Sequence, residues 1–403
     1  MKAEFERKII ALGVHFGAKD LRSFRKEKAD IDFLRDSQIG ENRLGKFFFI
    51  DKFYGNDYIH GTVAFSEILN SNSEFNLPDI SVGLQWNQCA FLDTETTGLS
   101  QSAGTFAFMV GVAKIVDHQF LLRQYFLKSP SEEAAMLNDL ENFLFGIKNI
   151  ISYNGIGFDV PILRHRYILH KMRSPFEHFE HLDLLKYSRN LWRYQFEDRS
   201  LKSVEARILK YTRTSEEVPG WMAPEIYREF LKTGNFSVIS GVFYHNAMDV
   251  ISLCALLSRY IPILNAKEAG SNGFETINFA MGRLHEKYDN LKLSIMFYQS
   301  AIDQTDIPKT MKIQAIRQLS KIYKKSGNYK EAILLWETGS ALTDVHCMIE
   351  LAKYFEHKER NYEQAIFWVE KGLQTISFSK EYGLYHELMY RQQRIINKME
   401  KNV

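Results

Sequence analysis

Stretches of apolar residues with strand-like and helix-like spacing alternate along the middle of the chain, from about residue 86 to residue 265. Apolar runs bounded by turn residues predict strands near 89–95, 105–116, 119–127 and 149–153. Apolar positions at helical spacing predict helices near 131–146, 159–171 and 244–257. This order predicts an α/β domain with a mixed central sheet flanked by helices.

The regions on either side of this domain have different patterns. Residues 1–85 contain alternating segments such as KFFFIDKFYG, which predict a small β segment in an N-terminal accessory region. Residues 268–403 are helical in pattern throughout, and a pair of small residues recurs in three similar helix–turn–helix segments. The pairs are Gly282 with Ser294, Ser320 with Ala332, and Ala352 with Ala365. An all-α domain of helical repeats is therefore expected after the α/β domain.

Composition excludes several classes of protein. The 403 residues are 45% hydrophobic, which is enough for two or three domains with cores. A net charge of +2 is far from the strongly basic balance of a dedicated nucleic-acid binder. Cys89, Cys254 and Cys347 form no zinc or disulfide motif. The N-terminus is mixed in charge and no uninterrupted apolar stretch reaches about 18 residues, so a cytoplasmic protein without membrane association is expected.

The first candidate motif is an acidic pair at the end of a predicted strand, in the segment CAFLDTETTGLS. Side chains alternate between the two faces of a strand, so Asp93 and Glu95 project together and Thr94 projects to the other face. Two carboxylates that face one point repel each other unless a cation lies between them, and a hard divalent ion suits such a site. An exposed acidic pair at a strand end is the alternative interpretation.

Two further motifs carry acidic residues. Asp159 lies in NIISYNGIGFDVPIL, where a strand, a glycine loop and a helix follow one another. An ordinary capping residue is the alternative there, because free N–H groups in the first helical turn favour an anion. The segment YHNAMDVISLCALL predicts a helix on which His245 and Asp249 share one face, with a surface ion pair as the alternative. The three motifs together favour a functional site.

With these residues in this order, the chain resembles the DEDD exonuclease superfamily of ribonuclease H-like fold, and in particular its YprB-type group. The resemblance covers about residues 86–265 and includes the segments HLDLLKYSRNLWR, RSLKSVE and EVPGWMAPEIY. It implies a 3′-to-5′ exonuclease that uses two divalent ions, Mg²⁺ or Mn²⁺. The ligands that it implies for these ions are Asp93, Glu95, Asp159 and Asp249.

The general base is the point at which the chain departs from this superfamily. The usual base is a His five residues before the last Asp or a Tyr four residues before it. Here His245 has the Tyr spacing and Tyr244 has the His spacing. The resemblance assigns His245 as the base, and Tyr244 is the alternative.

The chemistry implied is hydrolysis of a phosphodiester bond by two metal ions. One ion lowers the pKa of a bound water, His245 accepts its proton, and the other ion stabilises the departing 3′ oxygen. The expected substrate is a single-stranded 3′ end of DNA or RNA. The resemblance places its terminal nucleotide against Thr96, Leu99, Asn154 and Phe158.

Other parts of the chain suggest further contacts with partners. Tyr187, Trp192 and Tyr194 interleave with basic residues and suit stacking on a single strand, although core packing explains them equally well. The helical segments resemble tetratricopeptide repeats, which implies a concave face for a protein partner unless they only cap the nuclease. A catalytically weak nucleic-acid-binding scaffold that acts through these repeats is the alternative function.

Overall fold

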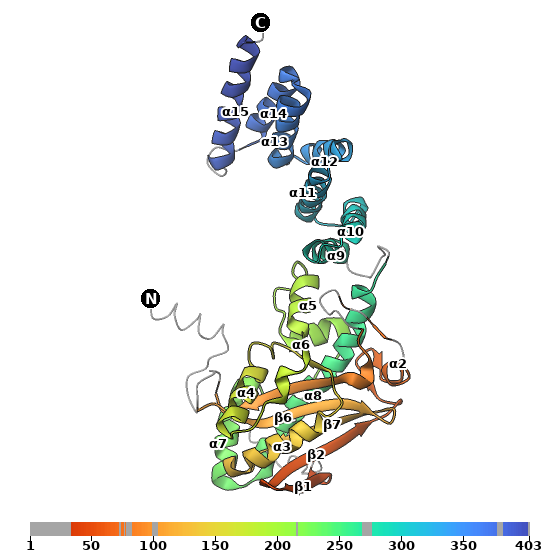
Figure 1. The fold of residues 1–403 in the computed structure, drawn as a ribbon, viewed down its shortest axis with the longest axis vertical. Coiled ribbons are helices and arrows are strands. Elements are labelled where there is room, and N and C mark those ends of the chain that lie inside the picture. The colour runs from red at the N-terminus through yellow and green to blue at the C-terminus, as the bar shows by residue number, and fades with distance from the viewer. Residues whose placement is uncertain are drawn as a thin grey trace. The chain divides into compact units, whose positions relative to one another are not determined.

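The computed structural model describes residues 34–71, 74–75, 77, 83–98, 104–214, 217–267, 276–376 and 382–401. The chain divides into an α/β unit and a helical unit (Figure 1). The α/β unit comprises Met1–Arg189 and Glu197–Asn265, and the helical unit comprises Asn190–Phe196 and Ala266–Val403. Residues 190–196, which were expected in the α/β domain, therefore belong to the helical unit.

A seven-stranded mixed sheet in the order β1-β2-β7-β6-β5-β8-β9 forms the centre of the α/β unit. The strands are β1 (Ser37–Asn42), β2 (Gly45–Tyr54), β5 (Cys89–Thr96), β6 (Ala107–Val116), β7 (Gln119–Phe126), β8 (Asn149–Ser152) and β9 (Glu180–Asp183). β8 is parallel to both β5 and β9, and the other neighbouring pairs are antiparallel. The predicted α/β class with a mixed central sheet is confirmed.

Two strands of the expected N-terminal accessory region extend this central sheet. β2 pairs with β7, and β1 pairs with β2. Phe47 and Phe49 pack into the core on one face of the sheet, while Phe48 and Ile50 pack into the core on the other face. A strand that is buried on both faces reads as a continuous apolar run, which suits the place of KFFFI between β1 and β7 in the central sheet. A small two-stranded sheet of β3 (Ile59–His60) and β4 (Val63–Ala64) follows.

Helices cover both faces of the sheet (Figure 1). α3 (Glu133–Phe143) and α4 (Asp159–Leu169) contribute to one core, and α7 (Ala223–Thr233) and α8 (Phe236–Leu264) contribute to the other. Short elements connect these parts: α2 (Ser66–Leu69), η3 (Trp86–Gln88), η4 (Pro130–Glu132), η5 (Pro175–Glu177), α5 (Leu184–Leu191), α6 (Leu201–Val204), η6 (Glu205–Leu209) and η7 (Gly220–Met222).

α8 is much longer than the helix expected at 244–257, and it is buried on most of its surface. It is the one helix in the described part of the chain that is long and apolar enough to cross a membrane. Within its most apolar window, however, 67% of the residues are buried inside the protein, and the helix packs against β5, β6 and β7. Its apolar character is therefore explained by its place in the core.

The helical unit contains α9 (Ile277–Lys287), α10 (Leu291–Asp303), α11 (Lys309–Lys325), α12 (Tyr329–Ala341), α13 (Val345–Tyr354), η8 (Phe355–Glu359), α14 (Tyr362–Thr375) and α15 (Tyr382–Lys401). The six small residues predicted to anchor the repeats are all buried. In the first pair, Ser294 Oγ donates a hydrogen bond to the Gly282 carbonyl at 2.9 Å. The all-helical prediction is confirmed, and the assignment to tetratricopeptide repeats stays a prediction.

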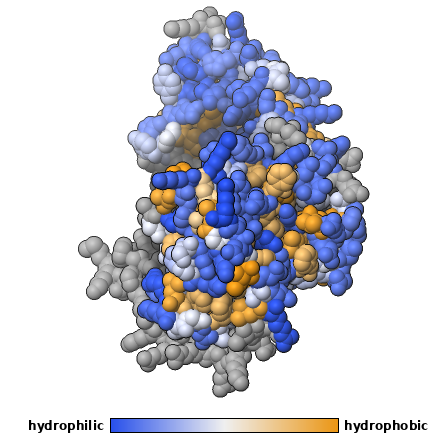
Figure 2. Space-filling view, turned by 60° about the horizontal axis from the view of Figure 1, so that its bottom comes forward, coloured by the Kyte–Doolittle hydropathy of each residue, from blue (hydrophilic) through white to orange (hydrophobic). Residues whose placement is uncertain are grey.

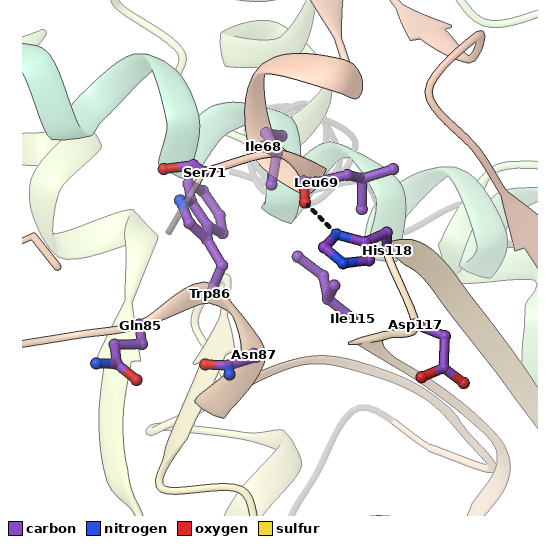
Figure 3. Close-up of a pocket in the computed structure, with 9 residues that line it drawn as sticks. All are labelled: Ile68, Leu69, Ser71, Gln85, Trp86, Asn87, Ile115, Asp117 and His118. Carbon is purple, nitrogen blue, oxygen red and sulfur yellow. Dashed lines mark hydrogen bonds between the residues drawn. The ribbon is translucent and has the colours of Figure 1, made fainter. Parts of the chain in front are cut away.

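The surface is largely hydrophilic on the face shown in Figure 2, with hydrophobic residues gathered in separate patches. A cavity of about 340 Å³ lies between the end of α2, η3 and the β6–β7 turn (Figure 3). Trp86 and His118 line it, and His118 Nδ1 lies 3.3 Å from the Leu69 carbonyl oxygen. None of the candidate site residues lines this cavity.

We expect stability to depend on pH through His181, a partly buried histidine on β9 beside β8. Its Nε2 lies 2.7 Å from Ser152 Oγ, and burial lowers its pKa from 6.5 to about 4. Because the pKa is lower in the folded state, the unfolded chain binds the proton first, and stability is lost as pH falls from about 6.5 towards about 4. We expect a loss of up to about 3 kcal/mol over this window in the wild type, most of which is absent in His181→Gln. Urea unfolding at several pH values measures it, and parallel pH curves for the two proteins would refute it.

Candidate active site

β5 ends in the expected acidic pair, and its side chains alternate as predicted. Asp93 faces α8, where Asn246 Nδ2 donates to its Oδ2 at 2.9 Å. Glu95 faces the same helix, and its Oε1 lies 3.8 Å from His245 Nε2. Thr94 faces the opposite side, where its Oγ1 donates to Asp159 Oδ1 at the start of α4. Elements on both faces of the sheet therefore bring side chains to the carboxyl end of β5.

α8 places His245 and Asp249 together, as their spacing of four residues predicts. His245 Nε2 lies 3.3 Å from Asp249 Oδ2, and both side chains are mostly buried, with exposed fractions of 17% and 13%. A pair held in this way beside Glu95 is not a solvated surface ion pair. α8 therefore places the Asp249 carboxylate and the His245 imidazole beside the acidic end of β5.

Asp159 reaches the site through a close turn between β8 and α4. A Cβ atom added at Gly155 would lie 2.4 Å from Ser152 Oγ and 3.0 Å from Asp159 Oδ2, so glycine lets the loop pass beside the carboxylate. Asp159 is only 5% exposed, and Phe158, not Asp159, occupies the capping position of α4. The Asp159 carboxylate also takes part in backbone hydrogen bonds with Asp159 and Thr94, so a first-turn interaction and a buried acidic position are both present.

Burial and neighbouring carboxylates oppose the charged forms of Asp93 and Glu95. Burial raises the pKa of Asp93 well above its usual range, and Asp249, Asp159 and Glu95 raise it further. Burial also raises the pKa of Glu95 and of Asp159, although His245 opposes the shift at Glu95 and Thr94 opposes it at Asp159. The cluster therefore holds more negative charge than its protein partners compensate, and a bound cation would relieve this repulsion.

The donor atoms of this cluster fit a hard divalent ion, because they are all carboxylate oxygens. In the part of the chain that the structure describes, no three His, Cys, Asp or Glu side chains are grouped closely enough to hold an ion together. Three of the carboxylates have a protein partner at one oxygen: Asn246 at Asp93, Thr94 at Asp159, and Arg213 at Asp249. The two-ion site stays a prediction.

The structure separates the two candidates for the general base. The Tyr244 hydroxyl accepts a hydrogen bond from the Thr214 amide at 3.0 Å and lies 3.4 Å from the Tyr211 hydroxyl. His245 instead lies among the acidic residues. Burial lowers the pKa of His245, but Asp249, Glu217 and Glu95 outweigh this and raise it to about 9. A cation held by Glu95 and Asp249 would offset the charges that retain the proton on His245.

The residues expected to contact the terminal nucleotide differ in exposure. Asn154 is exposed and has a left-handed backbone conformation (φ 69°). The Asp183 carboxylate accepts a hydrogen bond from the Asn154 backbone amide at 2.8 Å. Phe158 is half-buried in the same loop. Thr96 is buried and its hydroxyl donates to the Gly98 carbonyl, so its side chain is not open to a ligand. Leu99 lies outside the described residues.

Two of the three aromatic residues expected to stack on a single strand, Tyr187 and Trp192, are buried and so do not form a stacking surface. Tyr187 is 1% exposed and Trp192 is fully buried. Tyr194 is partly buried against the core of the helical unit. Core packing, the alternative interpretation of these residues, is therefore correct for Tyr187 and Trp192.

A buried pair of amides fixes Asp93 and was not foreseen from the sequence. Gln124 Nε2 on β7 donates to Asn246 Oδ1 at 2.9 Å, and Asn246 in turn donates to Asp93. Both amides are nearly inaccessible, with exposed fractions of 2% and 0%. The signal available in the sequence is a glutamine within an apolar strand and an asparagine beside His245 in an apolar helix. Polar residues at core positions are retained where their hydrogen bonds are satisfied.

Gly111 on β6 leaves the space that Asn246 occupies. A Cβ atom at position 111 would lie 2.3 Å from Asn246 Oδ1. We expect Gly111→Ala to lower the free energy of unfolding by about 1–3 kcal/mol, because either the amide or the strand must move. Gly104→Ala is the control, since a Cβ there has no atom within 4 Å. Urea unfolding curves compare the two, and equal stability of both variants would show that Asn246 is not confined.

Two charged residues from the segment before η7 complete the site. The Arg213 guanidinium is 2% exposed, pairs with Asp249, and donates to Glu205 at 2.8 Å and to Glu217 at 3.2 Å. Glu217 Oε1 lies 3.5 Å from His245 Nδ1. No periodic pattern in the sequence indicates Arg213. Glu217 lies in EVPGWMAPEIY, one of the segments that carry the resemblance.

This fold and this acidic site define the α/β unit as a ribonuclease H-like, nuclease-type domain, and residues 90–261 match the RNase_H superfamily. Over 400 residues the chain is 30% identical to the uncharacterized protein YprB of Bacillus subtilis (strain 168), and the match covers 93% of each protein. The chain belongs to the family of YprB. The resemblance to the YprB-type ribonuclease H-like group is thereby confirmed.

A solved structure gives a more distant likeness. The family B DNA polymerase from the hyperthermophilic archaeon Pyrobaculum calidifontis is 14% identical with a TM-score of 0.34. The match covers 57% of this chain and 29% of the polymerase. A likeness this distant carries no conclusion about substrate or direction of cleavage.

Proposed function

We propose that this protein is a metal-dependent 3′-to-5′ exonuclease that hydrolyses phosphodiester bonds of DNA or RNA. The observation that carries the proposal is that four acidic side chains from three distant segments approach one another near the carboxyl end of β5. Three of them are near enough to Asp93 to raise its pKa, although no three described side chains are grouped closely enough in this structure to hold one ion together. Asp93 and Glu95 come from β5, Asp159 from α4 and Asp249 from α8. His245 lies within 4 Å of two of these carboxylates. Nuclease-type superfamily membership supports the same class of reaction.

The acidic residues and His245 have different roles in the proposed reaction. Asp93, Glu95, Asp159 and Asp249 would hold two divalent ions, Mg²⁺ or Mn²⁺, which lower the pKa of water and stabilise charge on the scissile phosphate. His245 accepts the proton of the attacking water at Nε2, the nitrogen that faces Glu95 and Asp249. Glu217 Oε1 at 3.5 Å and Arg213 Nη1 at 3.3 Å both face the other ring nitrogen, Nδ1, so these two groups orient the imidazole with Nε2 towards the carboxylates.

The nucleic acid is bound at the exposed rim of the site. The loop between β8 and α4 presents Asn154 and Phe158 at its surface, and both lie within six residues of Asp159. We assign the terminal nucleotide of a single-stranded 3′ end to this loop, with the Phe158 ring beside the sugar or base. A single strand brings its 3′ end to a confined acidic site without the cost of opening base pairs.

Linear and circular substrates test the proposal against other nuclease reactions. Purified protein with Mg²⁺ or Mn²⁺ is expected to shorten linear single-stranded DNA or RNA and to leave a circular single strand of the same sequence intact. Cleavage of the circular strand would indicate an endonuclease. If neither substrate changes but both bind, the alternative of a nucleic-acid-binding scaffold that acts through its helical unit replaces the proposal.

A further inference from the structure

Arg213 occupies a central place in the polar network around the site. Its guanidinium is almost fully buried and pairs with three carboxylates, those of Asp249, Glu205 and Glu217. Its Nη1 also lies 3.3 Å from His245 Nδ1. A buried guanidinium with several partners is held in one orientation, because its planar fork fixes the direction of each hydrogen bond. Arg213 therefore constrains both the Asp249 carboxylate and the His245 imidazole.

A second group of buried residues holds Arg213 in place. Ser252 Oγ on α8 donates to Glu205 Oε1 at 2.5 Å, while Arg213 Nε binds the other oxygen of the same carboxylate at 2.8 Å. His60 Nε2 lies 2.7 Å from Ser252 Oγ and 3.5 Å from Glu205 Oε1. Ser252, Glu205 and His60 are all 1% exposed or less. The contacts run without interruption from β3 to Asp249.

The segment that forms β3 and β4 is anchored to this network by a backbone hydrogen bond and by packing of aromatic rings. The Thr62 amide donates to the Leu209 carbonyl at 2.8 Å. The His60 imidazole packs against the Tyr211 ring, with centroids 4.0 Å apart and ring planes tilted by 30°. Tyr211 precedes Arg213 by two residues, so the small sheet of β3 and β4 restrains the segment that carries the guanidinium.

We propose that Arg213 is a positioning residue that orients Asp249 and His245, and that His60, Ser252 and Glu205 fix Arg213 in the orientation this requires. The proposal gives His60 a role that the reaction itself does not require. It rests on the metal site of the proposed function, because Asp249 needs a fixed orientation only if it binds a metal ion. Residues that orient a metal ligand typically contribute a factor of about 10–100 in metal affinity or activity.

Binding of Mn²⁺ to the full chain tests this proposal without depending on turnover. Electron paramagnetic resonance measures free Mn²⁺ in titrations of wild type, Arg213→Lys, Ser252→Ala and Asp249→Asn. Lysine keeps the positive charge but cannot bind three carboxylates in fixed directions. We expect Arg213→Lys to weaken Mn²⁺ binding about 10- to 100-fold, and Ser252→Ala to weaken it less but in the same direction. In assays on single strands, kcat should fall with Arg213→Lys while KM changes less than about threefold.

Arg123→Lys is the matched control for a loss of stability. Arg123 also makes a two-point ion pair, with Asp51, and a further pair with Asp139, and none of these is part of the acidic site. This variant should bind Mn²⁺ as the wild type does, even if it unfolds at a lower urea concentration.

The outcomes separate the failure of this proposal from the failure of the proposed function. Arg213→Lys that binds Mn²⁺ within twofold of wild type, while Asp249→Asn does not, overturns the positioning role. Equal binding by wild type and Asp249→Asn overturns it as well, since no metal ion then depends on Asp249. If Mn²⁺ binding weakens as expected but no protein degrades nucleic acid, the positioning role is supported and the exonuclease function is refuted.

Discussion

Asp93→Asn is expected to abolish degradation of single-stranded nucleic acid while leaving the fold as stable as before or more stable. Asparagine has the same shape, and its carbonyl oxygen still accepts from Asn246, so the change removes little except charge. Loss of residues that merely orient metal ligands costs about 10–100-fold, so loss of a ligand should lower kcat by at least about 1000-fold. Stability should not fall, because burial and three neighbouring carboxylates already oppose the charge on Asp93.

The combination of these two effects is what distinguishes a functional carboxylate from a structural one. Asp117→Asn is the control, because Asp117 lies exposed in the β6–β7 turn, where asparagine is equally suited to its positive φ of 48°. Initial rates on end-labelled oligonucleotides and urea unfolding curves measure both effects. An Asp93→Asn protein that is clearly less stable, or that keeps more than a tenth of the wild-type rate, would contradict the assignment.

The second large effect is expected at His245. Replacement by glutamine removes the group that accepts the water proton, and general base catalysis typically contributes about 100- to 10,000-fold, so kcat should fall by a factor in this range. Tyr244→Phe should change kcat less than about tenfold, because the Tyr244 hydroxyl accepts from the Thr214 backbone amide and lies beside the Tyr211 hydroxyl. Single-turnover rates at saturating Mg²⁺ measure the chemical step directly.

His346→Gln serves as the control for a histidine outside the site, since His346 is exposed on α13. Its rate should equal that of the wild type. A larger loss with Tyr244→Phe than with His245→Gln would transfer the role of base to Tyr244, whose spacing before Asp249 is that of the histidine in the wider superfamily.

Local periodicity explains why the central residues of the site could be predicted from the sequence. Alternation along β5 places Asp93 and Glu95 on one face and Thr94 on the other, and a spacing of four on α8 brings His245 within 3.3 Å of Asp249. These relations depend only on the geometry of a strand or a helix. The apolar runs likewise identified the strands that carry the site.

Contacts between distant segments could not be predicted in this way. Arg213 lies in an irregular segment, and its partners Glu205 and Asp249 are defined by packing and not by spacing. Gln124 meets Asn246 across 122 positions in the sequence. β2 illustrates the same limit at the level of the fold, because its run KFFFI predicts a strand but does not identify β7, far along the chain, as its second partner. Strand pairing is set by the whole sheet, so local patterns leave it open.

Four carboxylates near the end of β5 are proposed to support metal-dependent removal of nucleotides from a 3′ end. A time course on a 5′-labelled single strand tests it most directly, with wild type in Mg²⁺, wild type in EDTA, and Asp93→Asn in Mg²⁺. We expect a ladder that shortens one nucleotide at a time in the first reaction and an unchanged strand in the other two. Shortening that persists in EDTA or in Asp93→Asn, or immediate release of the 5′ label as a mononucleotide, would contradict it.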